Sequence, residues 1–235
     1  MSDYQSLIED AITQSLAELD TECELYGVRL LLIGGFAVRA YGQRRRATTD
    51  VDFIIKRVDR NQLIGLLQRQ GFRVDADSRF GMKASREVGD HLMKVDISIE
   101  QIHDEMTDSL FRFSDESFRR AERHVVESLS GRFRVEFYVI PLADLMISKL
   151  MTARDQDASD AINLILEYMP SAQLEAEIKR KAREAGLANR INQRATELVQ
   201  WSDGRINGLM AGYVGAKLTL SDLRKLRALF RDLRI

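Results

Sequence analysis

Apolar residues recur at helical spacing near the N-terminus and throughout the last third of the chain. Over residues 4–25 an apolar stripe that includes Leu7, Ala11 and Leu19 lies opposite a row of glutamates, which predicts an amphipathic helix. After Pro141 the sequence has helical periodicity only. It predicts helices over 142–150 and 158–169, and four more between residues 171 and 233.

The part of the chain between these regions has the alternating apolar and polar positions of β-strands. An apolar run over 28–33 predicts a short buried strand, and a glycine pair and a short helix over 36–41 follow it at once. A helix over 61–70 and five further strands are expected, at residues 50–55, 72–74, 79–85, 91–99 and 133–140. This order of elements predicts an α+β domain over residues 1–140 and a helical domain over 141–235.

Composition narrows the class of protein. The 235 residues are 45% hydrophobic and 30% charged, which is typical of a globular chain and excludes a disordered or fibrous one. The net charge of −1 means that any contact with nucleic acid must be local. The single Cys23 cannot form an internal disulfide, and with three scattered histidines it makes no zinc cluster. The sequence has no signal-peptide pattern and no window of about 20 apolar residues, so we expect a cytoplasmic protein outside the membrane.

Two aspartates stand out within the strand predicted at residues 50–55. Asp50 and Asp52 are two positions apart, so they project from the same face of that strand. Two neighbouring carboxylates repel one another unless a cation neutralises them, and Mg²⁺ prefers oxygen ligands of this kind. Carboxylates that share Mg²⁺ with substrate phosphates are a recurrent arrangement for nucleotidyl transfer.

The glycine pair before the short helix offers a second part of the same site. Without Cβ atoms, Gly34 and Gly35 let the backbone approach a phosphate, and the helix directs free N–H groups toward it. Asp96 is the best third acid, because it alternates with the apolar Val95 and Ile97 on another strand. Asp90 and Glu100 flank that strand and are the alternatives; alternation alone favours Asp96.

Each of these features has an ordinary structural explanation when it stands alone. A glycine pair is commonly a tight turn, and an acid-x-acid pair is commonly a solvated strand edge or a cap. Here the strand, glycine pair, helix, basic loop and paired aspartates follow one another in a single connected segment. This order favours a catalytic site over a set of unrelated turns.

The stretch from Leu31 to Ile55 resembles the core motif of the DNA polymerase β-like nucleotidyltransferase superfamily. It is most similar to the minimal bacterial and archaeal branch with the AbiEii-type toxins and aminoglycoside nucleotidyltransferases, which shares the R-x-T-x-D-x-D order of Arg46, Thr48, Asp50 and Asp52. A later segment, PLADLMISKLMTARDQDASDAINLI, resembles a helical motif with a lysine and two aspartates, here Lys149, Asp157 and Asp160. Gln156 departs from the pattern, since relatives often have lysine there.

The resemblance implies a small mixed sheet flanked by helices, followed by an all-helical C-terminal region. It further implies transfer of a nucleoside monophosphate from an NTP, ATP among them, to an acceptor hydroxyl, with release of pyrophosphate. Asp50, Asp52 and Asp96 would be catalytic and bind Mg²⁺, with Mn²⁺ as the alternative ion. The nucleotide would be bound by Gly34, Gly35, Arg46, Thr48, Lys149, Asp157 and Asp160.

The partners implied by the resemblance are an NTP, an acceptor and, for a toxin-like relative, a cognate antitoxin. The acceptor could be tRNA, a protein hydroxyl or a small molecule such as an aminoglycoside. A different hypothesis is a protein that kept the fold and lost turnover, acting as a nucleotide-binding scaffold or regulator. The basic cluster Arg44–Arg46 beside the expected site could steady phosphates, and a solvated basic loop explains it about equally well.

Overall fold

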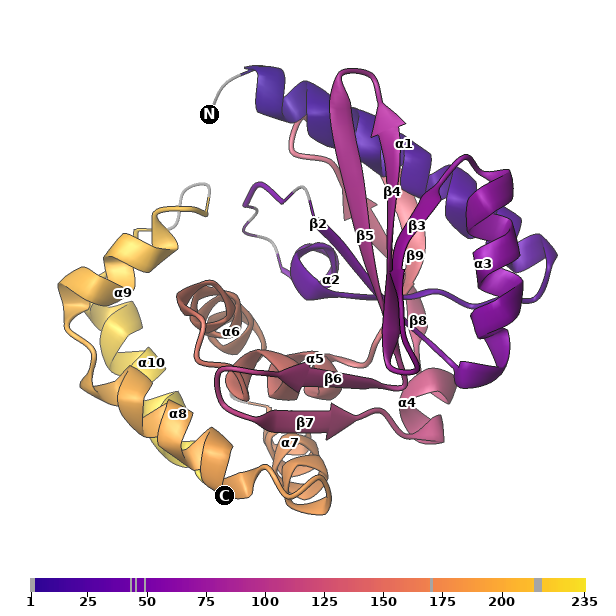
Figure 1. Ribbon diagram of the computed structural model, residues 1–235. Helices are drawn as coiled ribbons and strands as arrows, with labels where there is room; N and C mark the ends of the chain where they lie inside the picture. Colours follow the sequence, from indigo (N-terminus) through magenta and orange to yellow (C-terminus); the bar gives the residue numbers. More distant parts are fainter. Residues whose placement is uncertain (1–2, 43, 45, 49, 170, 214–216) are drawn as a thin grey trace. The chain divides into compact units, whose positions relative to one another are not determined.

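The computed structural model describes residues 3–42, 44, 46–48, 50–169, 171–213 and 217–235 (Figure 1). The chain forms two compact units. We call one the sheet unit, made of Met1–Ala40, Ala47–Gln101 and Phe113–Pro141. We call the other the helical unit, made of Tyr41–Arg46, Ile102–Arg112 and Leu142–Ile235. The last long segment begins just after Pro141, and two short internal segments join it in the helical unit.

The sheet unit is built on a seven-stranded sheet in the order β3-β4-β5-β2-β1-β9-β8. Strand β2 is antiparallel to β1 and parallel to β5, so the sheet is mixed, as the sequence resemblance implies. The strands are β1 (Leu31–Ile33), β2 (Asp50–Ile55), β3 (Arg73–Asp77), β4 (Gly81–Val88), β5 (His91–Ile99), β8 (Glu122–Glu127) and β9 (Arg134–Val139).

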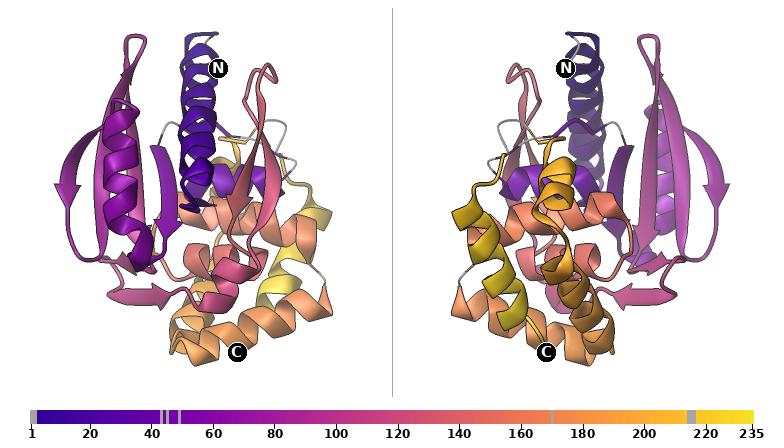
Figure 2. Two further views of the ribbon diagram at one scale, coloured as in Figure 1. Left: turned by 90° about the vertical axis from the view of Figure 1, so that its right-hand side faces the viewer. Right: turned by 90° about the vertical axis from the view of Figure 1, so that its left-hand side faces the viewer.

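Helices cover both faces of this sheet. The long α1 (Asp3–Leu25) and α3 (Arg60–Arg69), which follows the short 3-10 turn η1 (Arg57–Asp59), lie on one face (Figure 2). The other face carries α2 (Gly34–Tyr41), while α4 (Asp115–Arg119) leads into β8. The fully buried core includes Ile12, Leu16, Leu19, Phe53, Val95 and Phe137. Burial of these apolar side chains is the main favourable term in folding of the unit.

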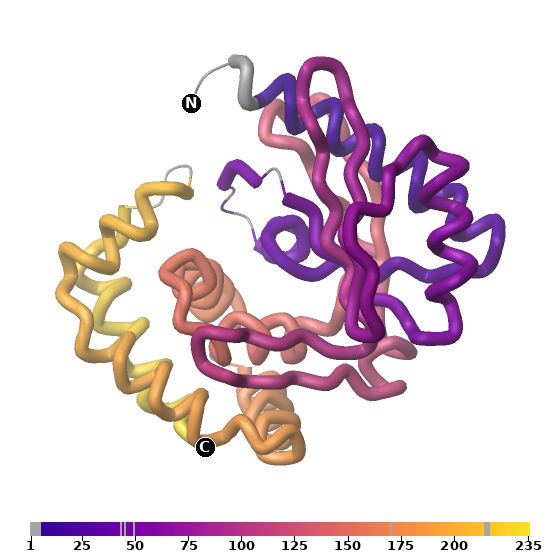
Figure 3. Tube along the Cα trace, in the orientation of Figure 1, coloured from indigo at the N-terminus to yellow at the C-terminus, as the bar shows by residue number. Residues whose placement is uncertain are grey.

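The helical unit confirms the helical periodicity of the last third of the chain. Its helices are α5 (Leu142–Leu150), α6 (Asp155–Tyr168), α7 (Ala172–Glu184), α8 (Ala188–Gln200), α9 (Asp203–Met210) and α10 (Leu220–Asp232). Figure 3 shows α8 and α10 side by side. Helix α10 begins at a capping box, in which the hydroxyl of Thr219 accepts from the N–H of Asp222 and the carboxylate of Asp222 accepts from the N–H of Thr219.

Besides the short 3-10 turn η1, four elements were absent from the sequence prediction. They are α4, β8 and the small two-stranded hairpin of β6 (Gln101–Asp104) and β7 (Ser109–Arg112). The hairpin is fixed by Thr107, whose hydroxyl donates to the carboxylate of Asp104 at 2.7 Å and lies 3.1 Å from the carbonyl of Met151. Such short strands have too few residues to establish an alternation in the sequence. Within the described part of the chain, no helix is both long and apolar enough to cross a membrane.

Candidate active site

The structure brings Asp52 and Asp96 together on neighbouring strands of the sheet unit. Strands β2 and β5 are parallel, and their register pairs Asp52 with Asp96 and Asp50 with Lys94. Neighbouring strands lie about 4.8 Å apart, so the two paired carboxylates are within reach of one shared ion. The sequence placed Asp96 on a separate strand, and the register shows that this strand adjoins β2. We call the face that bears Asp50, Asp52, Asp96, Lys94, Ser85 and Lys83 the carboxylate face.

Burial on the opposite face determines that the aspartates point this way. Val51, Phe53 and Val95 are fully buried, and they alternate with the aspartates along β2 and β5. A slip of one residue in the register would move a carboxylate into this apolar layer and a large apolar side chain out of it. The hydrophobic core therefore fixes the direction of the acids.

Gly34 lies directly against the carboxylate of Asp52. Ile33, the residue before it, is the register partner of Asp52 on β1. The backbone of Gly34 has φ +67°, and a Cβ built at this position would collide with the carboxylate of Asp52. Glycine is thus required twice, for the left-handed backbone and for the close approach. Gly35 is buried in the first turn of α2, whose N-terminal N–H groups offer a favourable position for an anion.

The two alternative third acids lie elsewhere. Glu100 follows the end of β5, and its carboxylate accepts from the N–H of Arg57 at 3.0 Å. Asp90 lies in the turn between β4 and β5, six residues from Asp96 and so about 20 Å away along the strand. Of the three acids, only Asp96 is the register partner of Asp52. The geometry therefore favours Asp96.

The donor set of the carboxylate face fits a hard divalent cation. It consists of carboxylate oxygens, and the carboxylate of Asp52 itself occupies the space that a side chain at Gly34 would fill. No group of three or more acidic, histidine or cysteine side chains among the described residues is arranged as a complete metal site. Mg²⁺ commonly binds through one or two carboxylates and completes its shell with waters and substrate phosphates. Asp52 and Asp96 suit that mode.

Glu9 of α1 is a buried carboxylate that joins the segments around the glycine turn, and sequence reasoning missed it. Its two oxygens accept from the guanidinium of Arg39 on α2, one of them at 3.0 Å. They also accept from the N–H of Leu129 at 2.7 Å and from the N–H of Thr48 at 3.4 Å. The hydroxyl of Thr48 in turn lies 3.3 Å from the carbonyl of Asp50. Glu9 therefore ties α2 to the segment that enters β2.

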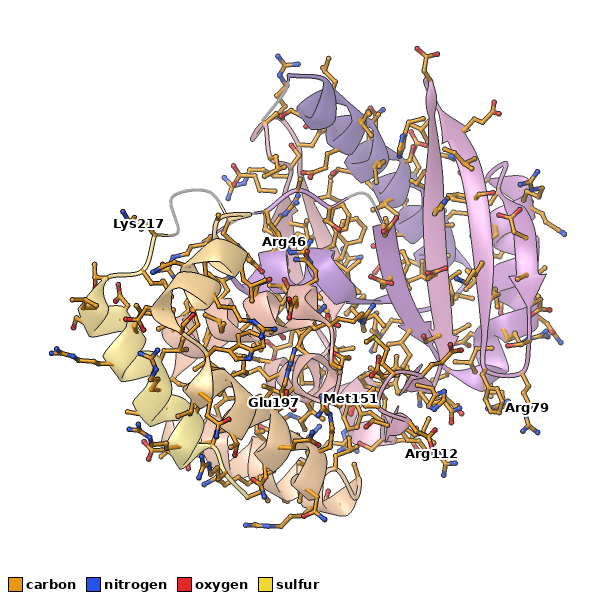
Figure 4. The ribbon with its side chains drawn as sticks, turned by 60° about the vertical axis from the view of Figure 1, so that its left-hand side comes forward. Arg46, Arg79, Arg112, Met151, Glu197 and Lys217 are labelled. Atoms are coloured by element: carbon orange, nitrogen blue, oxygen red, sulfur yellow. The ribbon has the colours of Figure 1, made fainter. Side chains whose placement is uncertain are left out.

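The helical unit gathers four of the other residues that the sequence singled out. The ammonium of Lys149 lies 2.7 Å from Asp157 and 2.8 Å from Asp160, and all three side chains are buried. Arg46 makes a bidentate contact with Asp160 at 2.8 and 3.0 Å, reaching it from the segment after α2 (Figure 4). Arg44 is described and exposed in part, whereas Arg45 lies outside the described residues.

The charges in this cluster stabilise one another. Burial alone would lower the pKa of Lys149, but the carboxylates of Asp160 and Asp157 outweigh burial, and the pKa is above its ordinary value. For Asp160 burial acts in the other direction, and the charges of Lys149 and Arg46 hold its pKa below the ordinary value. Both groups are therefore charged at neutral pH, as a compensated buried network.

Three further members of the cluster were not predicted. Tyr213 donates its hydroxyl to Asp160, and burial followed by the charge of Asp160 raises the pKa of Tyr213 well above its ordinary value. Thr152 donates to Asp157 at 2.9 Å, and the largely exposed Arg154 lies 2.7 Å from the same carboxylate. The spacing of Arg154 and Asp157, one helical turn, could have indicated their contact. Tyr213 is 53 residues from Asp160 and gave no such signal.

Comparison with solved structures shows the same fold. A protein from Helicobacter pylori, JHP933, is similar with a TM-score of 0.53 at 13% identity, over 100% of this chain and 93% of that one. The nucleotidyltransferase toxin MenT4 of Mycobacterium tuberculosis H37Rv is similar with a TM-score of 0.52 at 12% identity, over 97% of this chain and 85% of that one. No curated protein sequence matches the chain.

A family model assigns the chain to a protein family. The similar solved structures agree with this assignment at the level of fold. The family model is described as "Nucleotidyltransferase of unknown function (DUF6036)" and matches residues 10–204. The match includes the glycine turn, the paired aspartates, Asp96 and the motif of Lys149, Asp157 and Asp160. The superfamily suggested by the sequence motif is thereby confirmed. The chain belongs to this nucleotidyltransferase family and is a transferase of nucleotidyl groups.

Proposed function

We propose that this nucleotidyltransferase uses Mg²⁺, with Mn²⁺ as the alternative, to move a nucleoside monophosphate from an NTP to an acceptor hydroxyl. The observation that carries the proposal is the row of Gly34, directly after β1, Asp52 on β2 and Asp96 on β5. It combines a glycine turn at the start of a helix, a favourable place for phosphate, with two carboxylates in register. Nucleotidyl transfer from an NTP needs this combination of a phosphate-binding turn and paired acids.

The proposed reaction forms a bond between the acceptor oxygen and the α-phosphorus and breaks the bond from that phosphorus to pyrophosphate. When bound by Asp52 and Asp96, with Asp50 beside them, Mg²⁺ would supply neutralisation of the charge on the phosphates. The backbone at Gly34 and Gly35 and the N-terminus of α2 bind phosphate oxygens. Asp96 accepts the proton of the acceptor hydroxyl, and the pyrophosphate leaves with the electron pair of the broken bond.

We propose that the cluster of Lys149, Arg46, Asp157 and Asp160, together with Thr48, contributes to nucleotide binding. Lys149, Arg46 and Arg154 give three positive charges against two carboxylates, which leaves one in excess. Because Lys149 is already held by two aspartates, the exposed Arg154 is the group best able to meet a phosphate. It also compensates for Gln156, at a position where relatives often have a cation.

The donor and the acceptor of this reaction are also part of the proposal. The donor is an NTP, ATP among them, and tRNA, a protein hydroxyl and an aminoglycoside are the candidate acceptors. A cognate antitoxin is the expected protein partner if the chain acts as a toxin. The competing hypothesis of an inactive scaffold predicts NTP binding that is indifferent to Mg²⁺ and forms no pyrophosphate.

Transfer of label from α-labelled NTPs tests the proposal directly. The wild-type protein is incubated with each NTP, Mg²⁺ or EDTA, and a panel of candidate acceptors. Asp52→Asn and Asp96→Asn each remove one charge at the row and should lower transfer by about 100-fold or more. Asp90→Asn makes the same chemical change in the exposed turn at the other end of β5 and should leave transfer unchanged.

Two results would contradict the proposal. One is label transfer that survives both Asp52→Asn and Asp96→Asn in protein shown by circular dichroism to be folded. The other is transfer that proceeds equally in EDTA. NTP binding measured by calorimetry, with and without Mg²⁺, separates loss of binding from loss of chemistry in each variant.

A further inference from the structure

Two lysines lie among the acids of the carboxylate face. Lys94 on β5 is the register partner of Asp50, and Lys83 on β4 is the register partner of Asp96. The ammonium of Lys83 lies 3.6 Å from the carboxylate of Asp96, and 69% of the Lys83 side chain is exposed. Lys94 is exposed as well. We call Lys83 and Lys94 the lysine pair.

The sheet order separates this pair from the phosphate-binding turn. Strand β2, with Asp52, has β1 and Gly34 on one side and β5 on the other, and β4 lies beyond β5. The row therefore runs Gly34, Asp52, Asp96, Lys83, and the lysine is two strand spacings, about 10 Å, from Asp52. If the triphosphate is held at Gly34, the opposite side of the acids is left for the acceptor.

The charge on this acceptor side changes when the site is loaded. In the structure Lys83 neutralises Asp96 and Lys94 adjoins Asp50. A divalent cation bound by Asp52 and Asp96 would supply their counter-charge, which would leave the ammonium groups of Lys83 and Lys94 available to another anion. Asp75 of β3 is bonded to Ser85 and Arg73, and these hydrogen bonds, with a smaller contribution from the charge of Lys94, lower the pKa of Asp75. Two cations then border the acceptor, and Asp75 opposes Lys94 only weakly, because Ser85 and Arg73 are its main partners.

We propose that the lysine pair is an acceptor-binding site for a molecule that carries phosphate next to its reactive hydroxyl. The inference rests on the proposed function, because it takes the side of the acceptor from the position of the NTP. Two exposed ammonium groups attract phosphate oxygens as point charges. They repel a polycation, so an aminoglycoside is disfavoured as the acceptor.

Binding without turnover tests the site. The probe is a short fluorescein-labelled single-stranded RNA with a free 3′ hydroxyl, titrated by anisotropy at several salt concentrations in Mg²⁺ and a non-hydrolysable NTP analogue. Lys83→Gln and Lys94→Gln should each weaken binding about two- to fivefold, and together about tenfold. Each should also reduce the slope of log K against log salt by about 0.7, because one phosphate contact with a single strand is lost.

Competition and control experiments show which kind of phosphate the lysine pair binds and whether the loss of RNA affinity is specific to these lysines. A nucleoside 5′-monophosphate competes for the site if phosphate alone is recognised, and fails to compete if an extended RNA backbone is needed. Lys225→Gln on α10 removes an exposed lysine of the helical unit and should not change affinity for the probe. An aminoglycoside should compete no better with the wild type than with the double variant.

The outcomes separate this inference from the proposed function. RNA affinity that is unchanged in Lys83→Gln/Lys94→Gln, or lowered equally by Lys225→Gln, overturns the lysine pair as a binding site. Tighter binding of the aminoglycoside than of either phosphate-bearing probe also overturns it. Failure of the proposed function appears instead as NTP binding and label transfer that do not depend on Asp52, whatever the lysine variants do.

Discussion

Replacement of Gly34 by alanine tests the junction between the glycine turn and Asp52. Gly34 has φ +67°, and the added Cβ would collide with the Asp52 carboxylate. Gly27 is a matched control, because it has φ +72° and a Cβ there would meet no atom within 4 Å. The two substitutions share the backbone penalty and the effect on the unfolded chain, and only Gly34→Ala adds a collision.

The expected magnitudes follow from these two contributions. A left-handed alanine costs about 1–2 kcal/mol, which is the whole effect expected for Gly27→Ala. Overpacking against Asp52 adds about 1–3 kcal/mol, so Gly34→Ala should lower the free energy of unfolding by about 2–5 kcal/mol. Because Asp52 must move to admit the methyl group, Gly34→Ala should also lower NTP transfer, whereas Gly27→Ala should not.

Urea denaturation followed by circular dichroism measures the difference in unfolding free energy between Gly34→Ala and Gly27→Ala. A third variant, Asp52→Gly, tests whether the cost at Gly34 comes from contact with Asp52. Asp52→Gly removes the three atoms that would lie nearest to a Cβ at Gly34. In that background the cost of Gly34→Ala should fall to that of Gly27→Ala. Equal costs for the two glycines in the wild-type chain, or no coupling between Gly34 and Asp52, would refute the close approach as a determinant of the site.

Three further measurements address charge and burial elsewhere. Asp160→Asn leaves Lys149 and Arg46 with one carboxylate fewer in a buried network, so the free energy of unfolding should fall by about 3–5 kcal/mol. The control Asp155→Asn, at an exposed position, should cost under about 1 kcal/mol in the same urea titration. Burial, together with Glu24 and despite Arg123, raises the pKa of Asp20 from 3.8 to about 6. Between these pH values the folded state binds a proton that the unfolded state has lost, so the free energy of unfolding should fall as pH rises from about 4 to 6. Asp20→Asn should flatten that part of the pH profile, and an unchanged slope would contradict the assignment. Burial and, to a smaller extent, the charge of Asp20 raise the pKa of the Cys23 thiol to about 12. A thiol reagent should therefore label Cys23 in urea and not in the native protein, and rapid labelling of the native protein would contradict its burial.

The sequence alone determined the local features of the site. Alternation along 50–55 and 91–99 was enough to place Asp50, Asp52 and Asp96 opposite an apolar layer, because burial of Val51, Phe53 and Val95 allows one orientation only. The helical periodicity after Pro141 was equally sufficient. The short hairpin of β6 and β7 and α4 escaped prediction because elements of four or five residues hold few periods. Strand β8 escaped because its sequence ERHVVE is mostly polar and has no apolar alternation.

Only the tertiary structure decided which of these residues meet. Strands β2 and β5 pair although β3 and β4 lie between them in the chain, and this pairing puts Asp96 beside Asp52 and Lys83 beside Asp96. Arg46 and Asp160 are 114 residues apart, and Tyr213 joins them from a third segment. Periodicity shows which side of an element is buried, whereas strand order and the pairing of buried charges depend on how the whole chain packs. The sequence therefore revealed the acids, and the fold revealed their neighbours.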